Sequence, residues 1–86
     1  MSDSIVLPEL VLTGDFVVKA GWVLSPRTLN EYELIYFPNG TESVYEVGDN
    51  AYLLDRPGFV VTRPGIRHTC RFDPERSTRH LFVRFT

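Results

Sequence analysis

Residues 56–68 read Arg-Pro-Gly-Phe-Val-Val-Thr-Arg-Pro-Gly-Ile-Arg-His, and this stretch decides the fold. Two Pro-Gly pairs, which favour tight turns, bracket the four β-prone residues 59–62. The stretch therefore predicts one short strand between two sharp turns, with His68 at the start of the next strand. A small β-barrel places a polar group at its mouth in this way, so the pattern indicates a binding pocket more than a catalytic centre.

The composition is that of one small globular domain. The chain has 86 residues, 43% hydrophobic and 13% aromatic, which suffices for a single core and is too apolar for a disordered segment. We therefore interpret residues 1–86 as a single domain. No apolar run approaches the roughly 20 residues of a membrane helix, and the acidic N-terminus lacks the basic region of a signal peptide. The single Cys70 excludes an internal disulfide and suits an inert core position. These features predict a cytoplasmic protein that does not associate with membranes.

Charge is divided unevenly along the chain. Residues 1–55 hold two basic and nine acidic residues, a net charge of −7, and residues 56–86 hold seven arginines and two acids, a net charge of +5. Either the two halves interleave in one barrel and their charges face each other, or the arginines form an anion-binding or nucleic-acid patch. Because the chain is acidic overall and has one lysine, direct DNA binding is the weaker interpretation.

Strand-prone runs recur at short, regular intervals, separated by turn residues. No window has the apolar spacing and capping residues of a helix. Asn39-Gly40 and Gly48-Asp49-Asn50 favour positive φ and tight hairpins, and residues 73–78 form a polar loop. The pattern indicates an all-β fold, a sandwich or a small antiparallel β-barrel. The predicted strands are Ile5–Leu7, Leu10–Leu12, Phe16–Lys19, Trp22–Leu24, Glu33–Phe37, Ser43–Val47, Ala51–Leu54, Phe59–Thr62, His68–Phe72 and His80–Phe85.

The alternation of side chains along each strand predicts which residues face the interior. In the last strand, Leu81, Val83 and Phe85 form an apolar face and are predicted to point inward, whereas His80, Phe82 and Arg84 alternate with them. The predicted barrel interior consists of Ile35, Phe37, Leu53, Val61, Cys70, Phe72, Leu81, Val83 and Phe85.

Three segments resemble the cupin barrel, and most of all the N-terminal sensor domain of AraC-type transcription regulators. They are residues 33–40, an acidic-aromatic-leucine strand that ends in a glycine turn; residues 58–68, with their Pro-Gly-Ile-Arg-His sequence; and residues 79–85, an aromatic strand. The likeness covers roughly residues 20–86. It implies a double-stranded β-helix, or jelly roll, with a pocket inside the barrel, and it makes residues 1–19 the counterpart of the family's N-terminal arm.

The resemblance also implies where a cupin metal would bind. Metal-binding cupins use two histidines and a glutamate from a first motif and one histidine from a second, and these positions fall here on Arg27, Leu29, Glu33 and His68. A catalytic Zn, Fe or Mn site needs about three protein ligands. Because only Glu33 and His68 remain, with Cys70 an unusual third, we expect no metal and no cofactor.

The resemblance therefore favours a ligand-sensing domain over an enzyme. The expected ligand is a small polar metabolite such as a sugar, held by polar groups at the barrel mouth and by aromatic rings, as in most pockets. The expected binding residues are Arg27, Glu33, His68 and Tyr45, with Trp22 and Phe37. The alternative is a stand-alone small cupin enzyme, such as a sugar isomerase or a metal-dependent dioxygenase. A third hypothesis is an interaction module that assembles through an exposed strand edge.

Each candidate residue also has a structural interpretation that the sequence leaves open. His68 suits a histidine that stabilises the preceding turn as well as it suits a ligand contact. Glu33 has Arg27 as a potential ion-pair partner at the barrel end. Tyr45 fits a half-exposed strand position, and Trp22 fits the core as well as a pocket wall.

The resemblance implies that such a sensor reaches DNA only through a separate unit with two helix-turn-helix motifs, for which this chain has no segment. The family's helical dimerisation element has no counterpart either. A homodimer, if formed, is therefore expected through sheet faces or edge strands.

Overall fold

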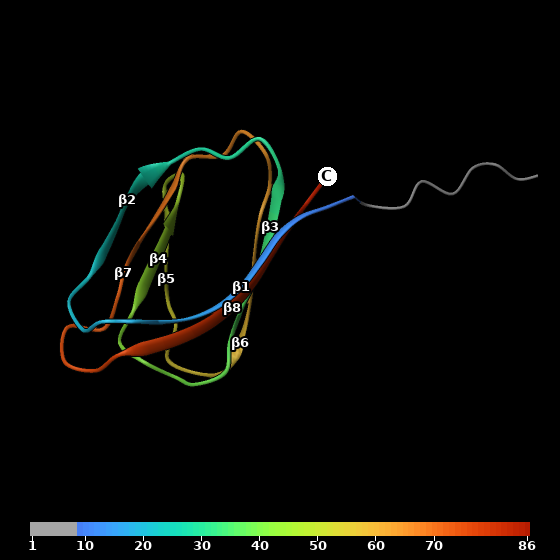
Figure 1. Ribbon diagram of the computed structural model, residues 1–86. Helices are drawn as coiled ribbons and strands as arrows, with labels where there is room; N and C mark the ends of the chain where they lie inside the picture. The colour runs from blue at the N-terminus through green and yellow to red at the C-terminus, as the bar shows by residue number, and fades with distance from the viewer. Residues whose placement is uncertain (1–8) are drawn as a thin grey trace, which may run out of the picture.

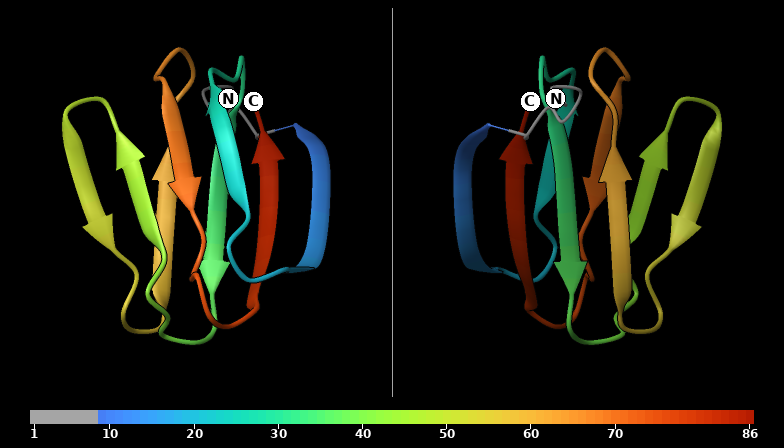
Figure 2. Two further views of the ribbon diagram at one scale, coloured as in Figure 1. Left: turned by 90° about the vertical axis from the view of Figure 1, so that its left-hand side faces the viewer. Right: turned by 90° about the vertical axis from the view of Figure 1, so that its right-hand side faces the viewer.

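Two antiparallel β-sheets make up the part of the chain that the structure, a computed structural model, describes, residues 9–86. This confirms the all-β prediction, and no helix occurs within these residues. Figure 1 views the two sheets edge-on, and Figure 2 shows each of them from its outer side. The strands are β1 Leu10–Val18, β2 Val23–Arg27, β3 Tyr32–Phe37, β4 Val44–Val47, β5 Asn50–Leu53, β6 Gly58–Thr62, β7 His68–Arg71 and β8 Thr78–Phe85.

The chain changes sheet at almost every connection. The first sheet has the order β1-β8-β3-β6 and the second the order β2-β7-β4-β5, so β4 and β5 are the only consecutive strands among these eight that pair. Nearly all contacts that hold the sandwich together are therefore distant in sequence. Strands with one face on a shared core and the other in solvent alternate inward and outward side chains, and this alternation sets the site described below.

β1 joins two predicted strands into one. Leu10–Leu12 and Phe16–Val18 lie in a single nine-residue strand because its partner β8 pairs with it from Leu10 to Val18, with one register shift between Leu10 and Leu12. The predicted Lys19 lies just beyond the end of β1. Gly14 does not interrupt β1, since the rings of Phe16 and Phe82 cover this position and would lie 2.5 Å from an added Cβ. The predicted strand Ile5–Leu7 lies outside the described residues.

Two of the predicted turns are confirmed and one is wrong. Gly48 (φ 56°) closes the β4–β5 hairpin, and Gly65 (φ 80°) turns the chain into β7. Asn39 and Gly40 do not adopt positive φ, and they connect β3 in one sheet to β4 in the other. The absence of a side chain at Gly40 serves a different purpose, because a Cβ there would collide with the backbone carbonyl of Asp55.

The buried core is smaller than the sequence predicts. Ile35, Phe37, Cys70 and Phe72 are buried as expected, and Tyr45 joins them with 1% exposure. The prediction was wrong for several others. Leu53 and Val61 are 55% and 59% exposed, and in β8 the two faces are exchanged.

The register explains the exchange of faces in β8. Ile35 pairs with Phe82 and Val60, whereas Leu34 pairs with Val83 and Val61. Side chains directly opposite one another share a face, so Phe82 points inward beside buried Ile35. Leu81, Val83 and Phe85 therefore lie on the outer face, contrary to the prediction.

The outer face of the first sheet is apolar. Tyr36 packs on Phe59 with ring centroids 4.8 Å apart, and Tyr32 stacks on Phe85 at 5.4 Å. At its margin Asp15 and Arg79 form an exposed ion pair. A homodimer through a sheet face stays a prediction.

Candidate functional site

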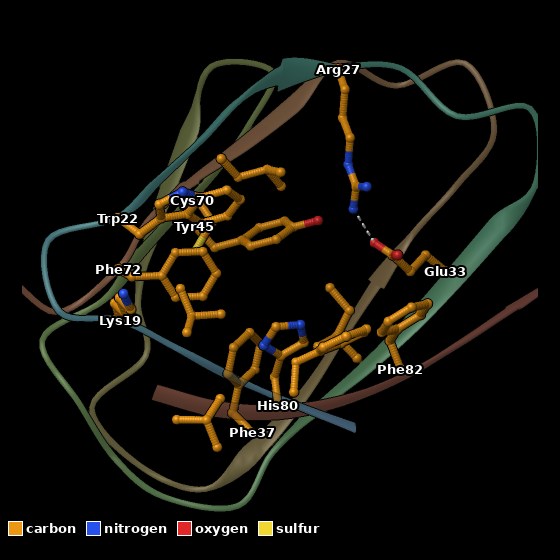
Figure 3. A pocket seen from close by; sticks show the side chains of 15 residues that line it. Lys19, Trp22, Arg27, Glu33, Phe37, Tyr45, Cys70, Phe72, His80 and Phe82 are labelled. Carbon is orange, nitrogen blue, oxygen red and sulfur yellow. Dashed lines mark hydrogen bonds and ion pairs between the residues drawn. The ribbon is translucent and has the colours of Figure 1, made fainter. Parts of the chain in front are cut away.

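A cavity of about 380 Å³ lies between the two sheets. Strands of both sheets contribute to its wall, and Figure 3 shows the side chains that point into it. Arg27 and Glu33 lie on one side of the cavity, whereas Phe37 and His80 lie on the opposite side. The volume is at the lower end of the range for small-molecule sites, which suits a small ligand.

Most of the cavity wall is aromatic or aliphatic. The aromatic members are Phe16, Trp22, Phe37, Tyr45, Phe72 and Phe82. The other apolar members are Val17, Val18, Leu24, Ile35 and Cys70. The polar members are Lys19, Arg27, Glu33 and His80. The structure thus brings together around one cavity the predicted site residues Trp22, Arg27, Glu33, Phe37 and Tyr45.

An ion-pair cluster closes one side of the cavity. Arg27 of β2 donates from Nη2 to Glu33 Oε1 at 2.8 Å, and Arg84 of β8 donates from Nε to Glu33 Oε2 at 3.0 Å. The Glu33 side chain is 2% exposed, so two guanidinium groups compensate one desolvated carboxylate. Because β2 and β3 belong to different sheets, the cluster also ties the sheets together. The predicted Arg27–Glu33 pair is present, and Arg84 is a third member that the sequence analysis missed.

His68 lies behind Arg27, outside the set of residues in 9–86 that line the cavity. It is 1% exposed. Its Nε2 accepts a hydrogen bond from Arg27 Nε at 3.0 Å, which leaves the ring hydrogen on Nδ1 to be donated to Ile66 O at 3.0 Å. His68 therefore positions Arg27 and braces the residue 64–67 turn; direct contact between His68 and a ligand stays a prediction.

Tyr45 provides a second polar link between the sheets. Its hydroxyl lies 2.5 Å from Thr62 Oγ1 of β6, and both residues are almost fully buried. Burial raises the pKa of Tyr45 above its usual value, so the hydroxyl stays protonated. With its phenol already bonded, Tyr45 contributes mainly a ring surface to the cavity.

His80 is a cavity residue that the sequence analysis missed. Its ring lies 5.9 to 6.2 Å from the rings of Phe16, Phe37, Phe72 and Phe82. Its Nδ1 is buried and has no hydrogen-bond partner within residues 9–86. Burial lowers the pKa of His80. The sequence signal that could have placed His80 in the cavity is the charge of Arg84. If Arg84 faces inward to pair with Glu33, His80 also faces inward, because residues 80 and 84 lie on the same face of β8.

The residues present do not fit a cupin-type metal. Both oxygens of Glu33 accept bonds from guanidinium groups, and His68 Nε2 accepts one from Arg27. A cation bound there would displace these bonds and approach two positive charges. Across the described range 9–86, no three His, Cys, Asp or Glu side chains gather in an arrangement suited to a metal ion.

A second buried polar cluster stabilises the loop before β8. Asp73 accepts backbone N–H bonds from Glu42, Glu75 and Arg76, which hold the pKa of its carboxyl below the usual value. Ser43 Oγ accepts the backbone N–H of Asp73 at 2.9 Å. The cluster is fully bonded and fixes the end of the sandwich.

Cys70 is expected to be chemically inert in the folded protein. It is 1% exposed, and burial raises the pKa of its thiol to about 12, so almost no thiolate forms near pH 8. We expect iodoacetamide to leave the native protein unmodified and to alkylate it in denaturant, as measured by intact-mass spectrometry. Rapid alkylation of the native protein would contradict this description.

Comparison with known proteins adds the fold and no function. No family model matches the chain, and no curated protein matches it. Among solved structures, protein NMB1881 from Neisseria meningitidis is similar, with a TM-score of 0.64 and 11% sequence identity over 99% of this chain and 89% of that one. An identity this low supports a shared fold alone. In residues 9–86, no helix has the length and apolar character needed to cross a membrane.

Proposed function

We propose that this chain is a small-molecule-binding domain with a cupin-like jelly-roll fold, and that it senses a metabolite for an AraC-type transcription regulator. The observation that carries the proposal is the cavity between the sheets, with its aromatic wall and its few polar groups. The strand orders β1-β8-β3-β6 and β2-β7-β4-β5 support the jelly roll, because each sheet combines strands from both halves of the chain. DNA contact is assigned to a separate helix-turn-helix unit outside these 86 residues.

Recognition without catalysis has the better support. The cavity's carboxylate is Glu33, and two arginines neutralise it. It is therefore poorly placed to act as a general base. The alternative, a metal-dependent isomerase or dioxygenase, would require Glu33 and His68 to abandon their bonds to Arg27. The proposed role needs no such rearrangement.

Ligand binding is testable with the single tryptophan. Trp22 lies on the cavity wall, 50% exposed, and packs against Phe72, so its fluorescence should change when the cavity is filled. We expect a screen of sugars, small acids and other metabolites to yield a compound that changes Trp22 emission and raises Tm. A ligand at about 100 times its Kd adds about 2.7 kcal/mol of stability, which for a domain of this size raises Tm by roughly 10–20 °C.

A matched pair of variants locates the bound compound. We expect Trp22→Ala to weaken ligand binding about tenfold, because the ligand loses its contact with the half-exposed indole ring. Phe59→Ala is expected to leave ligand binding unchanged. Both side chains are exposed aromatics, and Phe59 lies on the outer face. Calorimetric titration gives both constants. If both variants lost the same amount of ligand affinity, the ligand would bind outside the cavity. A screen in which no compound raises Tm would contradict the proposed function.

A further inference from the structure

The charges around the cavity do not balance. At the Glu33 cluster, the guanidinium groups of Arg27 and Arg84 share one carboxylate, and His68 Nε2 accepts a further hydrogen bond from Arg27. The cluster therefore carries one net positive charge in a site that is largely withdrawn from water. Lys19 adds a second cation to the wall. A desolvated positive charge of this kind favours an anion.

Arg27 has donors left for that anion. A guanidinium has five N–H groups, and Arg27 uses one on His68 and one on Glu33, so three remain. Its side chain is 28% exposed and lines the cavity. Two bonds hold the guanidinium in place, and its remaining N–H groups can donate to a carboxylate, which guanidinium geometry suits.

The rest of the wall favours a flat apolar body over a sugar. Glu33 and the Tyr45 hydroxyl are already bonded, and the unpartnered polar group opposite them within residues 9–86 is His80 Nδ1. Most hydroxyl groups of a sugar would lose their water without gaining a partner, at a cost of roughly tenfold in affinity for each. An aromatic ring would instead lie among Phe16, Phe37 and Phe82.

We propose that the cavity binds an aromatic carboxylate, with the carboxylate on Arg27 and the ring against the aromatic wall beside His80. This rests on the proposed ligand-binding function and names the class of ligand. It replaces the sugar predicted from the sequence, because the Glu33 carboxylate and the Tyr45 hydroxyl, which could accept hydrogen bonds from a sugar, are already bonded within the protein.

Comparing phenylacetate with its neutral analogue phenylacetamide tests whether the ligand's negative charge contributes to binding. Glucose tests whether the cavity binds a sugar instead. With the intact 86-residue chain, we expect calorimetry to give a Kd for phenylacetate at least tenfold lower than for phenylacetamide, and no binding of glucose. Trp22 emission supplies an independent readout. This comparison uses the unaltered protein, so its result does not depend on whether a variant folds.

Variants at Arg27 assign the preference to one group. We expect Arg27→Gln to abolish the preference for phenylacetate over phenylacetamide. Arg27→Lys should retain part of this preference, because the positive charge stays while the planar guanidinium is lost. Arg56→Gln, at a side chain that is 85% exposed, should leave the preference unchanged. Circular dichroism of each variant would test whether it is folded.

The outcomes separate this inference from the proposed function. Equal affinity for phenylacetate and phenylacetamide would overturn the proposal that Arg27 recognises a carboxylate. Binding of glucose, or of another metabolite from the screen, without binding of phenylacetate overturns the aromatic acid and leaves a ligand-binding domain. If no compound of any class binds, both proposals fail.

Discussion

Glu33→Ala is expected to lower the free energy of unfolding by about 3–5 kcal/mol, the usual cost of removing one partner from a buried ion pair. Glu33 is 2% exposed and accepts a guanidinium hydrogen bond on each oxygen. Without it, two positive charges remain beside each other in a poorly hydrated site, and the bond from β2 to β3 is lost. Urea denaturation followed by circular dichroism measures the change.

Two control variants define the cause of this loss. Asp15→Asn removes a carboxylate from an ion pair whose two side chains are each 50% exposed, and we expect little change in stability because water screens such pairs. The triple replacement Arg27→Met, Glu33→Met, Arg84→Met removes all the charges at once, and we expect it to be more stable than Glu33→Ala. If Glu33→Ala and Asp15→Asn have the same effect, the cluster does not stabilise the fold.

Gly40→Ala is expected to cost about 2–3 kcal/mol, near the upper end for an overpacked site. The new methyl group would collide with the carbonyl of Asp55, which is backbone and cannot rotate away as a side chain does. Gly40 lies in the crossover from β3 to β4, beside the link in which Thr41 N donates to Leu54 O at 2.9 Å. Tm should fall by roughly 10 °C or more, as measured by calorimetry.

Gly58→Ala is the matched control for this substitution. Gly58 has an ordinary φ, and an added Cβ there meets no atom within 4 Å. Since alanine also loses less backbone entropy than glycine on folding, we expect Tm to stay the same or rise slightly. A comparable fall in Tm for both variants would show that Gly40 has no special packing role.

The places of most strands followed from short-range chemistry, although two of the predicted strands form the single strand β1. Turn residues such as those around Gly48 and Gly65 act through their own φ angles, and β-branched runs between them extend locally. The same reasoning failed for Asn39-Gly40, because Gly40 is required by close packing against the backbone of Asp55, fifteen positions along the chain. Such a packing requirement leaves no local signature.

The faces of β8 show what alternation alone cannot determine. Leu81 and Val83 on one side and Phe82 on the other are all apolar, so hydrophobicity favours neither side. The deciding partner is Glu33 of β3, whose buried carboxylate needs Arg84 on the inner face. That need is visible only when the two strands are paired, and the same choice determines that His80 enters the cavity.

Two of the polar residues on the cavity wall, Arg27 and Glu33, followed from the sequence because they align with a known motif, whereas Lys19 and His80 did not. Arg27 and Glu33 fall at positions that the cupin resemblance marks. Trp22, Phe37 and Tyr45 are aromatic residues within the predicted strands Trp22–Leu24, Glu33–Phe37 and Ser43–Val47. His68 fell at such a position as well, yet Arg27 lies between it and the cavity. A motif fixes a residue's place along a strand, whereas a long neighbouring side chain decides whether that residue lines the cavity.

β1 is an edge strand that carries part of the cavity wall. It is hydrogen-bonded on one side, to β8, and Phe16, Val17 and Val18 line the cavity. Edge elements of this kind detach at a lower free energy than the strands between them. A guest molecule in the cavity would bury itself partly against β1 and so raise the free energy needed to peel it away. Amide hydrogen exchange along residues 10–18 would then slow when the cavity is occupied, so that ligand binding would be coupled to the stability of β1.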